Sequence, residues 1–260
     1  MKNRINSLFE SKKENILSVY FTAGFPNLND TVEIIQQLEI NGVDLIEIGM
    51  PFSDPTADGP TIQRSSEISL KNGMSLELLF EQLKNIRQTV KIPLILMGYL
   101  NPVYQFGVER FCEKCAEIGI DGTILPDLPL DEFEQYYKPV FEKHNLHNIL
   151  LITPQTTESR IRQIDAASSV FIYMVSSSST TGAGKKVEDF QRGYFERIQS
   201  MNLKNPRLIG FGISDGATFE NACKYANGAI IGSAFVKAID SEIKLEESVP
   251  GFIKNLLTTG

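Results

Sequence analysis

The sequence predicts an α/β fold, a (β/α)8 TIM barrel that forms one domain over residues 1–260 and carries a short N-terminal helix. Three observations lead to this prediction. Eight short apolar runs alternate with longer amphipathic segments, a pattern typical of strand–helix repeats around a parallel sheet. The length of 260 residues suits a barrel, because this fold needs about 250 residues. No inter-domain linker interrupts the repeats.

The eight apolar runs are the predicted strands. Each is nearly continuous in apolar residues, which is typical of parallel strands that are covered on both faces. A doubly wound open sheet is the alternative. It usually has about five or six strands and often a glycine-rich fingerprint in its first loop, and the sequence fits neither feature. The runs are residues 16–22, 43–49, 93–98, 119–125, 149–153, 170–175, 207–211 and 228–231.

The segments between the runs predict helices. Apolar residues recur there at the i, i+3, i+4, i+7 spacing of one helix face. Ser75 is placed to cap one of these helices, and Asp30 with Glu33 resembles a capping box. The clearest periods lie in residues 76–86, 108–118 and 133–141.

The bulk properties exclude several classes of protein. A net charge of -7 and a pI near 5.1 disfavour nucleic-acid binding over a broad surface. Three cysteines do not form a secreted disulfide framework. No apolar run approaches the roughly 20 residues that span a bilayer. The polar N-terminus lacks the apolar core of a signal peptide, and Ile5, Leu8 and Phe9 fit a short helix instead. We therefore expect a cytoplasmic protein without a membrane partner.

Two carboxylates stand near the end of the second predicted strand, where this fold carries its reacting groups. Glu47 shares its side-chain direction with Val43 and Leu45. Burial there raises the pKa of an unpaired carboxyl and makes it a useful acid or base near neutral pH. A salt-bridged glutamate is the alternative. Asp58 follows in a loop with three prolines, residues 50–60, which can hold it close to Glu47, although turn chemistry alone also explains that composition.

The last two predicted strands end in glycine and a hydroxyl residue, in the sequences GFGIS (210–214) and GAIIGSA (228–234). Glycine lets the backbone approach a phosphate, and a helix that begins there directs free N–H groups at it. The loops after strands seven and eight are the usual phosphate site of this fold. We expect such a site here; helix capping by Ser214 and Ser233 is the alternative.

A polar segment, residues 176–186, follows the sixth predicted strand. It fails the P-loop pattern, because Ser179 replaces the first glycine and Lys186 the final hydroxyl residue. We interpret the segment as a lid that closes over the phosphate, and a plain surface loop is the alternative.

The cysteines and histidines predict no second site. Cys112 and Cys115 have redox-motif spacing, but they lie on an apolar helix face, where core packing is favoured. His144 and His147 have no third ligand, so no metal is predicted. We expect no other cofactor in this chain.

Residues 47–60, EIGMPFSDPTADGP, closely resemble the signature of the tryptophan synthase α family. The resemblance covers nearly the whole chain. One departure concerns the lid, where Ser179 stands near a position that is usually glycine in the family, and serine restricts the backbone conformations available there. Further matching segments are FTAGFP (21–26), YLNP (99–102) with Gly107, Asp121-Gly122, LPDLP (125–129), GFGIS (210–214) and GSA (232–234).

The resemblance implies a lyase that splits indole-3-glycerol phosphate into indole and glyceraldehyde 3-phosphate, the α reaction of L-tryptophan biosynthesis. It implies that Glu47 is the general acid/base and that Asp58 stabilises the positive charge at the indole N–H. Tyr173 would line the site beside the glutamate, Thr181 would pair with the loop aspartate on lid closure, and Tyr99 and Phe211 would flank the indole. The implied phosphate ligands are Gly182, Gly212, Gly232 and Ser233.

The resemblance also implies a β-subunit partner in an α2β2 heterotetramer, with pyridoxal phosphate only in that partner. Two alternatives remain at this point. One is another phosphate-binding barrel, such as a sugar-phosphate isomerase or aldolase, although no strand carries the late lysine of a Schiff-base aldolase and phosphoribosylanthranilate isomerase would not explain the loop signature. The other is a non-catalytic activator of a β subunit, which the presence of both Glu47 and Asp58 disfavours.

Overall fold

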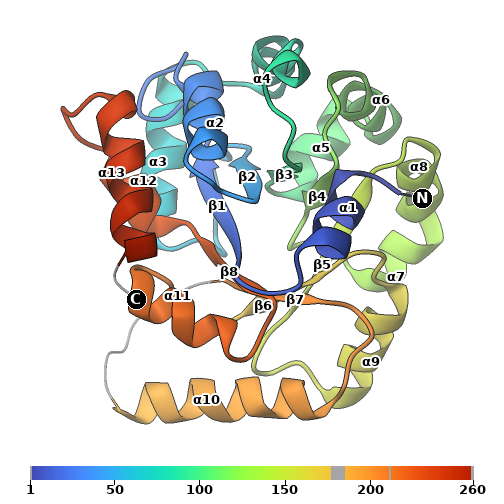
Figure 1. The fold of residues 1–260 in the computed structure, drawn as a ribbon. Coiled ribbons are helices and arrows are strands. Elements are labelled where there is room, and N and C mark those ends of the chain that lie inside the picture. The colour runs from blue at the N-terminus through green and yellow to red at the C-terminus, as the bar shows by residue number, and fades with distance from the viewer. Residues whose placement is uncertain (1, 177–184, 211, 259–260) are drawn as a thin grey trace.

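A computed structural model describes residues 2–176, 185–210 and 212–258 of the chain. Eight parallel strands close into a barrel in chain order, and helices surround it (Figure 1). The last strand pairs with the first, since Ile16 lies opposite Gly228. The predicted TIM barrel is therefore confirmed. The strands are β1 (Ile16–Thr22), β2 (Leu45–Gly49), β3 (Leu94–Met97), β4 (Gly122–Ile124), β5 (His147–Ile152), β6 (Ile172–Val175), β7 (Arg207–Gly210) and β8 (Gly228–Ile231).

The helices follow the predicted periods. A π-helical stretch, η2 (Phe133–Tyr137), joins α7 to α8, and a 3-10 turn, η1 (Ile86–Gln88), follows α4. The helices are α1 (Arg4–Ser11), α2 (Thr31–Ile40), α3 (Pro60–Lys71), α4 (Leu76–Leu83), α5 (Leu100–Phe106), α6 (Val108–Ile118), α7 (Leu130–Glu132), α8 (Lys138–Lys143), α9 (Glu158–Ala167), α10 (Lys185–Ser200), α11 (Gly216–Cys223), α12 (Ser233–Ile239) and α13 (Leu245–Thr258).

One of the two predicted helix caps is confirmed. The Ser75 hydroxyl accepts a hydrogen bond from the Leu78 N–H at 3.2 Å and caps α4. The capping box at Asp30 was wrong. Asp30 has a helical backbone conformation, and its carboxylate instead accepts hydrogen bonds from the backbone N–H and side-chain amide of Asn27. The turn before α2 therefore takes up the Asp30 carboxylate, which is then not used to cap the helix.

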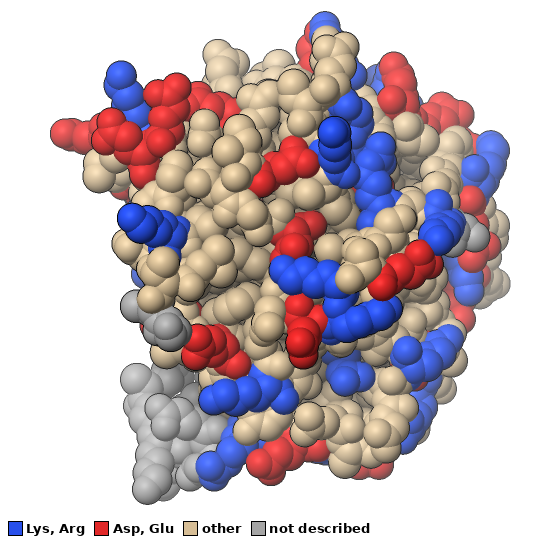
Figure 2. Space-filling view, viewed as in Figure 1, with Lys and Arg blue, Asp and Glu red and all other residues tan. Residues whose placement is uncertain are grey.

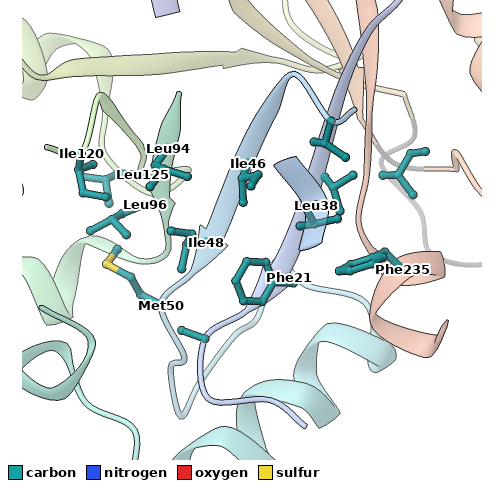
Figure 3. Close-up of a cluster of buried hydrophobic side chains, with 14 of the residues drawn as sticks. Phe21, Leu38, Ile46, Ile48, Met50, Leu94, Leu96, Ile120, Leu125 and Phe235 are labelled. Carbon is teal, nitrogen blue, oxygen red and sulfur yellow. The ribbon is translucent and has the colours of Figure 1, made fainter. Parts of the chain in front are cut away.

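The outward side chains of the strands form the larger part of the core, between the barrel and the helices. Phe21 of β1, Ile46 and Ile48 of β2, and Leu96 of β3 belong to this layer, with Phe235 of α12 (Figure 3). Because successive side chains of a strand point to opposite faces, Leu45 and Glu47 point into the barrel.

The inward side chains form a second apolar cluster, which α1 closes at the amino-terminal end of the strands. Ile5 and Phe9 of α1 pack with inward residues such as Leu45 and Ile149, and the Phe9 ring lies 5.4 Å from that of Phe171. The apolar floor makes any charged group above it costly to bury.

Candidate active site

Glu47 is fully buried in the barrel interior. Its Oε1 accepts a hydrogen bond from the Ser18 hydroxyl at 3.0 Å, whereas its Oε2 has no hydrogen-bond partner among the described residues. Burial raises the pKa of Glu47 to about 8, and the Ser18 hydrogen bond opposes that rise. No ion pair reaches Glu47 in the described part of the chain, so the salt-bridge alternative was wrong. The carboxyl can hold a proton at neutral pH and release it to a substrate.

Asp58 lies in the loop between β2 and α3, and Tyr99 fixes its carboxylate. The Tyr99 hydroxyl donates to Asp58 Oδ2 at 3.2 Å and accepts from the Ala57 N–H at 3.0 Å. Burial raises the pKa of Asp58, and the Tyr99 hydrogen bond opposes the rise. The Tyr99 ring stacks on Phe52 of the same loop, with centroids 5.0 Å apart. This arrangement holds Asp58 at the carboxyl end of the strands.

Two tyrosines connect the carboxylates into one site. Tyr173 of β6 is buried, and Tyr20 of β1 lies opposite Glu47 in the strand register. Burial raises the pKa of both phenols, and the negative charges of Asp58 and Glu47 raise it further. Each phenol therefore lies close enough to both carboxylates for their charges to act on it.

Tyr20 and Ser18 are site residues that the sequence analysis missed. Both lie on the inward face of β1 together with Ile16 and Thr22, because strand side chains alternate. Polar residues at alternate positions of a buried strand were the signal that could have found them.

Two glycines at strand ends make room for these phenols. A Cβ on Gly49 would lie 2.2 Å from the Tyr20 hydroxyl oxygen, and a Cβ on Gly210 would lie 2.1 Å from that of Tyr173. Any other residue at either position would displace the phenol. The glycines therefore allow both rings to lie against the backbone at the end of the barrel.

The two loops that predict a phosphate site differ in structure. Gly232 precedes α12, whose first turn has no side-chain cap, and a Cβ on Gly232 would lie 3.4 Å from the Tyr20 ring. The start of α11 is instead capped by the Asp215 carboxylate, which accepts from the Thr218 N–H at 2.9 Å. A phosphate is therefore favoured near α12 and disfavoured at the start of α11.

Helix capping by Ser214 and Ser233, the alternative to a phosphate site, was wrong, because Asp215 and Gly232 occupy the cap positions. Gly212 has φ +76, a backbone conformation that favours glycine, and lies beside Ser176. Of the remaining predicted site residues, Thr181, Gly182 and Phe211 lie outside the described residues, as does Ser179.

The cysteine pair lies in the core, as expected. Cys112 and Cys115 are buried, and burial raises the pKa of both thiols. His147 accepts or donates hydrogen bonds with Ser169 and Asn6, and burial lowers its pKa to about 4. The two cysteines are therefore core side chains, and Ser169 and Asn6 satisfy both ring nitrogens of His147.

The described residues contain one group with metal-ligand spacing, at a distance from the barrel interior. Glu109, Glu113 and His144 each offer one ligand atom, and these atoms lie within 4.8 Å of one another. Lys143 and His144 already contact Glu109. Glu109 of this surface group is therefore already paired within the protein. The prediction that the chain needs no metal stays a prediction.

The comparisons with known proteins agree with this geometry. The family model described as "Tryptophan synthase alpha chain" matches residues 7–255. The chain belongs to the tryptophan synthase alpha chain family. The tryptophan synthase alpha chain of Flavobacterium psychrophilum is 63% identical over 235 residues, which cover 90% of this chain and 92% of that protein.

Solved structures of the tryptophan synthase family show the same fold. The alpha subunit from Legionella pneumophila matches with a TM-score of 0.88 at 31% identity, covering 98% of this chain and 97% of that one. A chain of the tryptophan synthase complex from Pyrococcus furiosus matches with a TM-score of 0.82 at 33% identity, covering 94% and 98%.

The surface adds two observations. Basic and acidic side chains are interspersed on the face seen in Figure 2, rather than gathered into one basic area. Within the described ranges, no helix is long and apolar enough to cross a membrane.

Proposed function

We propose that this chain cleaves indole-3-glycerol phosphate into indole and glyceraldehyde 3-phosphate, as the α subunit of a tryptophan synthase. The observation that carries the proposal is a carboxyl with a pKa of about 8 in the same site as a second carboxylate that accepts a tyrosine hydrogen bond. Two carboxyl groups in different surroundings can serve as acid and as charged stabiliser at one pH. Family membership supports the same reaction.

The first chemical step is protonation of the indole ring by Glu47. A new C–H bond forms at C3 of the indole as the O–H bond of Glu47 breaks, and positive charge develops on the ring nitrogen. Asp58 stabilises this charge, and the low dielectric of the site strengthens the attraction. Because Oε2 is the oxygen without a partner, it is the atom that we assign to the transfer.

The second step is a retro-aldol cleavage. The Glu47 carboxylate, now ionised, takes the proton of the glycerol hydroxyl next to C3. The carbonyl of glyceraldehyde 3-phosphate forms, the carbon–carbon bond breaks, and its electron pair returns to the ring to give indole. Glu47 ends the cycle protonated, so it returns to its starting state without any added co-reactant.

The substrate phosphate is assigned to the loops after β7 and β8. Gly232 and Ser233 begin α12, whose uncapped first turn offers backbone donors, and Gly212 lies in the preceding loop. Gly182 completes the proposed set of phosphate ligands, and Thr181 is proposed to pair with the loop aspartate. Tyr99 and Phe211 are proposed to flank the indole, with Tyr173 beside Glu47.

The partner proposed for this chain is a tryptophan synthase β subunit, in an α2β2 assembly. The support is the match to chains from tryptophan synthase complexes, including that of Pyrococcus furiosus. We also propose that residues 1–260 form one domain and that the chain works in the cytoplasm, which suits a biosynthetic enzyme.

The test of the proposed function is indole release from indole-3-glycerol phosphate, measured with and without a β subunit. Glu47→Gln keeps the size of the side chain but removes the transferable proton, so we expect release to fall at least about a thousandfold. The matched control is Glu117→Gln, an exposed glutamate on α6 that pairs with Lys114.

Three outcomes separate the candidate functions. Release lost in Glu47→Gln and kept in Glu117→Gln supports the lyase. Release by Glu47→Gln at the parental rate would contradict it. A parent chain that releases no indole, but accelerates the β subunit, would favour the non-catalytic activator.

A further inference from the structure

Ser18 supplies a hydrogen bond to the proposed acid/base, and the surroundings of that bond are unusual. The side chains of Ser18 and Glu47 are both fully buried, and they come from neighbouring strands, β1 and β2. The Ser18 hydroxyl lies 3.0 Å from Glu47 Oε1. Apolar side chains of the inner cluster, such as Ile16 and Leu45, lie on the floor below.

The hydrogen bond from Ser18 makes the two carboxyl oxygens of Glu47 inequivalent. Oε1 is occupied by the hydroxyl, and Oε2 is buried without a partner among the described residues. A serine hydroxyl has one hydrogen to donate. If it donates to Oε1, the acidic proton of Glu47 resides on Oε2, the oxygen that is free to meet a substrate.

The Ser18 hydroxyl has no other hydrogen-bond partner among the residues that the structure describes. Its effect is therefore concentrated on one group. A buried hydroxyl without a partner would itself cost free energy, and the contact satisfies the Ser18 hydroxyl and one of the two carboxyl oxygens. Without this contact, no hydrogen bond from the described residues would hold the Glu47 carboxyl in one orientation.

We propose that Ser18 is a positioning residue that holds Glu47 by Oε1 and thereby makes Oε2 the oxygen that exchanges protons with the substrate. This inference rests on the proposed function and names a residue whose role that function does not require. In this proposal the Glu47 carboxyl supplies the proton, and the Ser18 hydroxyl orients the carboxyl.

Removing the Ser18 hydroxyl should shift the pKa of Glu47 in a predictable direction. The Ser18 bond favours the charged form of Glu47 and opposes the effect of burial on its pKa. Ser18→Ala should therefore raise the pKa of Glu47 further and leave the carboxyl less well oriented. We expect turnover in indole release to fall about tenfold, the factor that corresponds to one hydrogen bond to a charged group.

The decisive measurement is the titration of the Glu47 carboxyl carbon by NMR in the full chain labelled with ¹³C-glutamate. The Glu47 signal is assigned by its absence in Glu47→Gln. Ser18→Ala should titrate at higher pH than the parent, and Ser18→Thr, which restores a hydroxyl, should titrate close to the parent. The matched control is Ser168→Ala, because this buried hydroxyl donates to the Ile164 carbonyl, outside the site.

The results distinguish the two proposals. If Glu47→Gln still releases indole, the proposed function fails. If Glu47→Gln is inactive but Ser18→Ala titrates and turns over like the parent, the role of Ser18 alone is overturned. A higher titration midpoint with slower turnover in Ser18→Ala, and not in Ser168→Ala, supports it. A fall in melting temperature without a shifted titration would identify a purely structural hydroxyl and count against the proposal.

Discussion

At the scale of single residues, Glu47 links the chemistry of the site to the stability of the fold. Its pKa of about 8 in the folded chain contrasts with about 4.3 in an unfolded one. Between these values the folded state binds one more proton than the unfolded state, so the free energy of unfolding decreases as the pH rises. The decrease ends above the folded pKa, where both states are ionised.

Glu47→Gln should therefore be more stable than the parent at high pH. We expect the two chains to unfold at similar urea concentrations near pH 4. At pH 8 the variant should gain on the order of a few kcal/mol, because an amide carries no charge to desolvate. Urea denaturation at both pH values checks this, and an equal difference at the two values would show that Glu47 does not titrate as described.

At the scale of secondary-structure elements, the strand ends determine how the site is shaped. Gly49 ends β2 directly beside the Tyr20 hydroxyl. Gly49→Ala should push the phenol out of its place, so we expect at least about a tenfold loss of indole release and a stability cost of about 1–3 kcal/mol.

Gly193→Ala is the control for that variant. Gly193 lies in α10, where an added Cβ would meet nothing within 4 Å, and alanine in a helix should stabilise by about 0.5–1 kcal/mol. Steady-state kinetics and thermal melts of both variants test the prediction. A fully active Gly49→Ala chain would show that the position of Tyr20 does not matter.

The sequence predicted the strands well, because their apolar runs are local signals. It also predicted that Glu47 is buried, because Glu47 stands late in a nearly continuous apolar strand, and the structure confirms this burial. It missed the partners of Glu47. Ser18 is 29 positions away, and which inward residues of β1 and β2 meet depends on the stagger of the closed barrel.

Competition between neighbouring polar groups explains where the predicted helix caps differ from the observed ones. Asp30 has the sequence of a helix cap, but a nearer amide from Asn27 satisfies its carboxylate. Asp215 rather than Ser214 caps α11, and the neighbouring hydroxyl instead donates to that same carboxylate at 3.0 Å. Periodicity alone cannot rank such neighbours.

At the scale of the whole molecule, a buried ionic network ties the N-terminal segment to the barrel. Asp121, 1% exposed, pairs with Arg87 at 2.7 Å and with Arg4 of α1 at 3.1 Å, and it accepts from the Leu94 N–H at 3.0 Å. The network lies at the amino-terminal end of β3 and β4, opposite the active site.

Asp121→Asn should destabilise the fold by about 3 kcal/mol, because it leaves the half-buried Arg87 without its counter-charge. Asp131→Asn breaks an exposed pair with Arg160 and should change stability by no more than about 0.5 kcal/mol. Urea denaturation of the two variants measures both effects. Equal midpoints would show that the buried network contributes no more than a surface pair.

The helix α1, which closes the amino-terminal end of the barrel, also limits how substrate and products can enter and leave. With Ile5 and Phe9 seated in the bottom of the barrel, the interior resembles a cup rather than a tube. Reactant and both cleavage products must then cross the same rim. Any group that covers this rim would therefore control both the entry of the substrate and the release of the products.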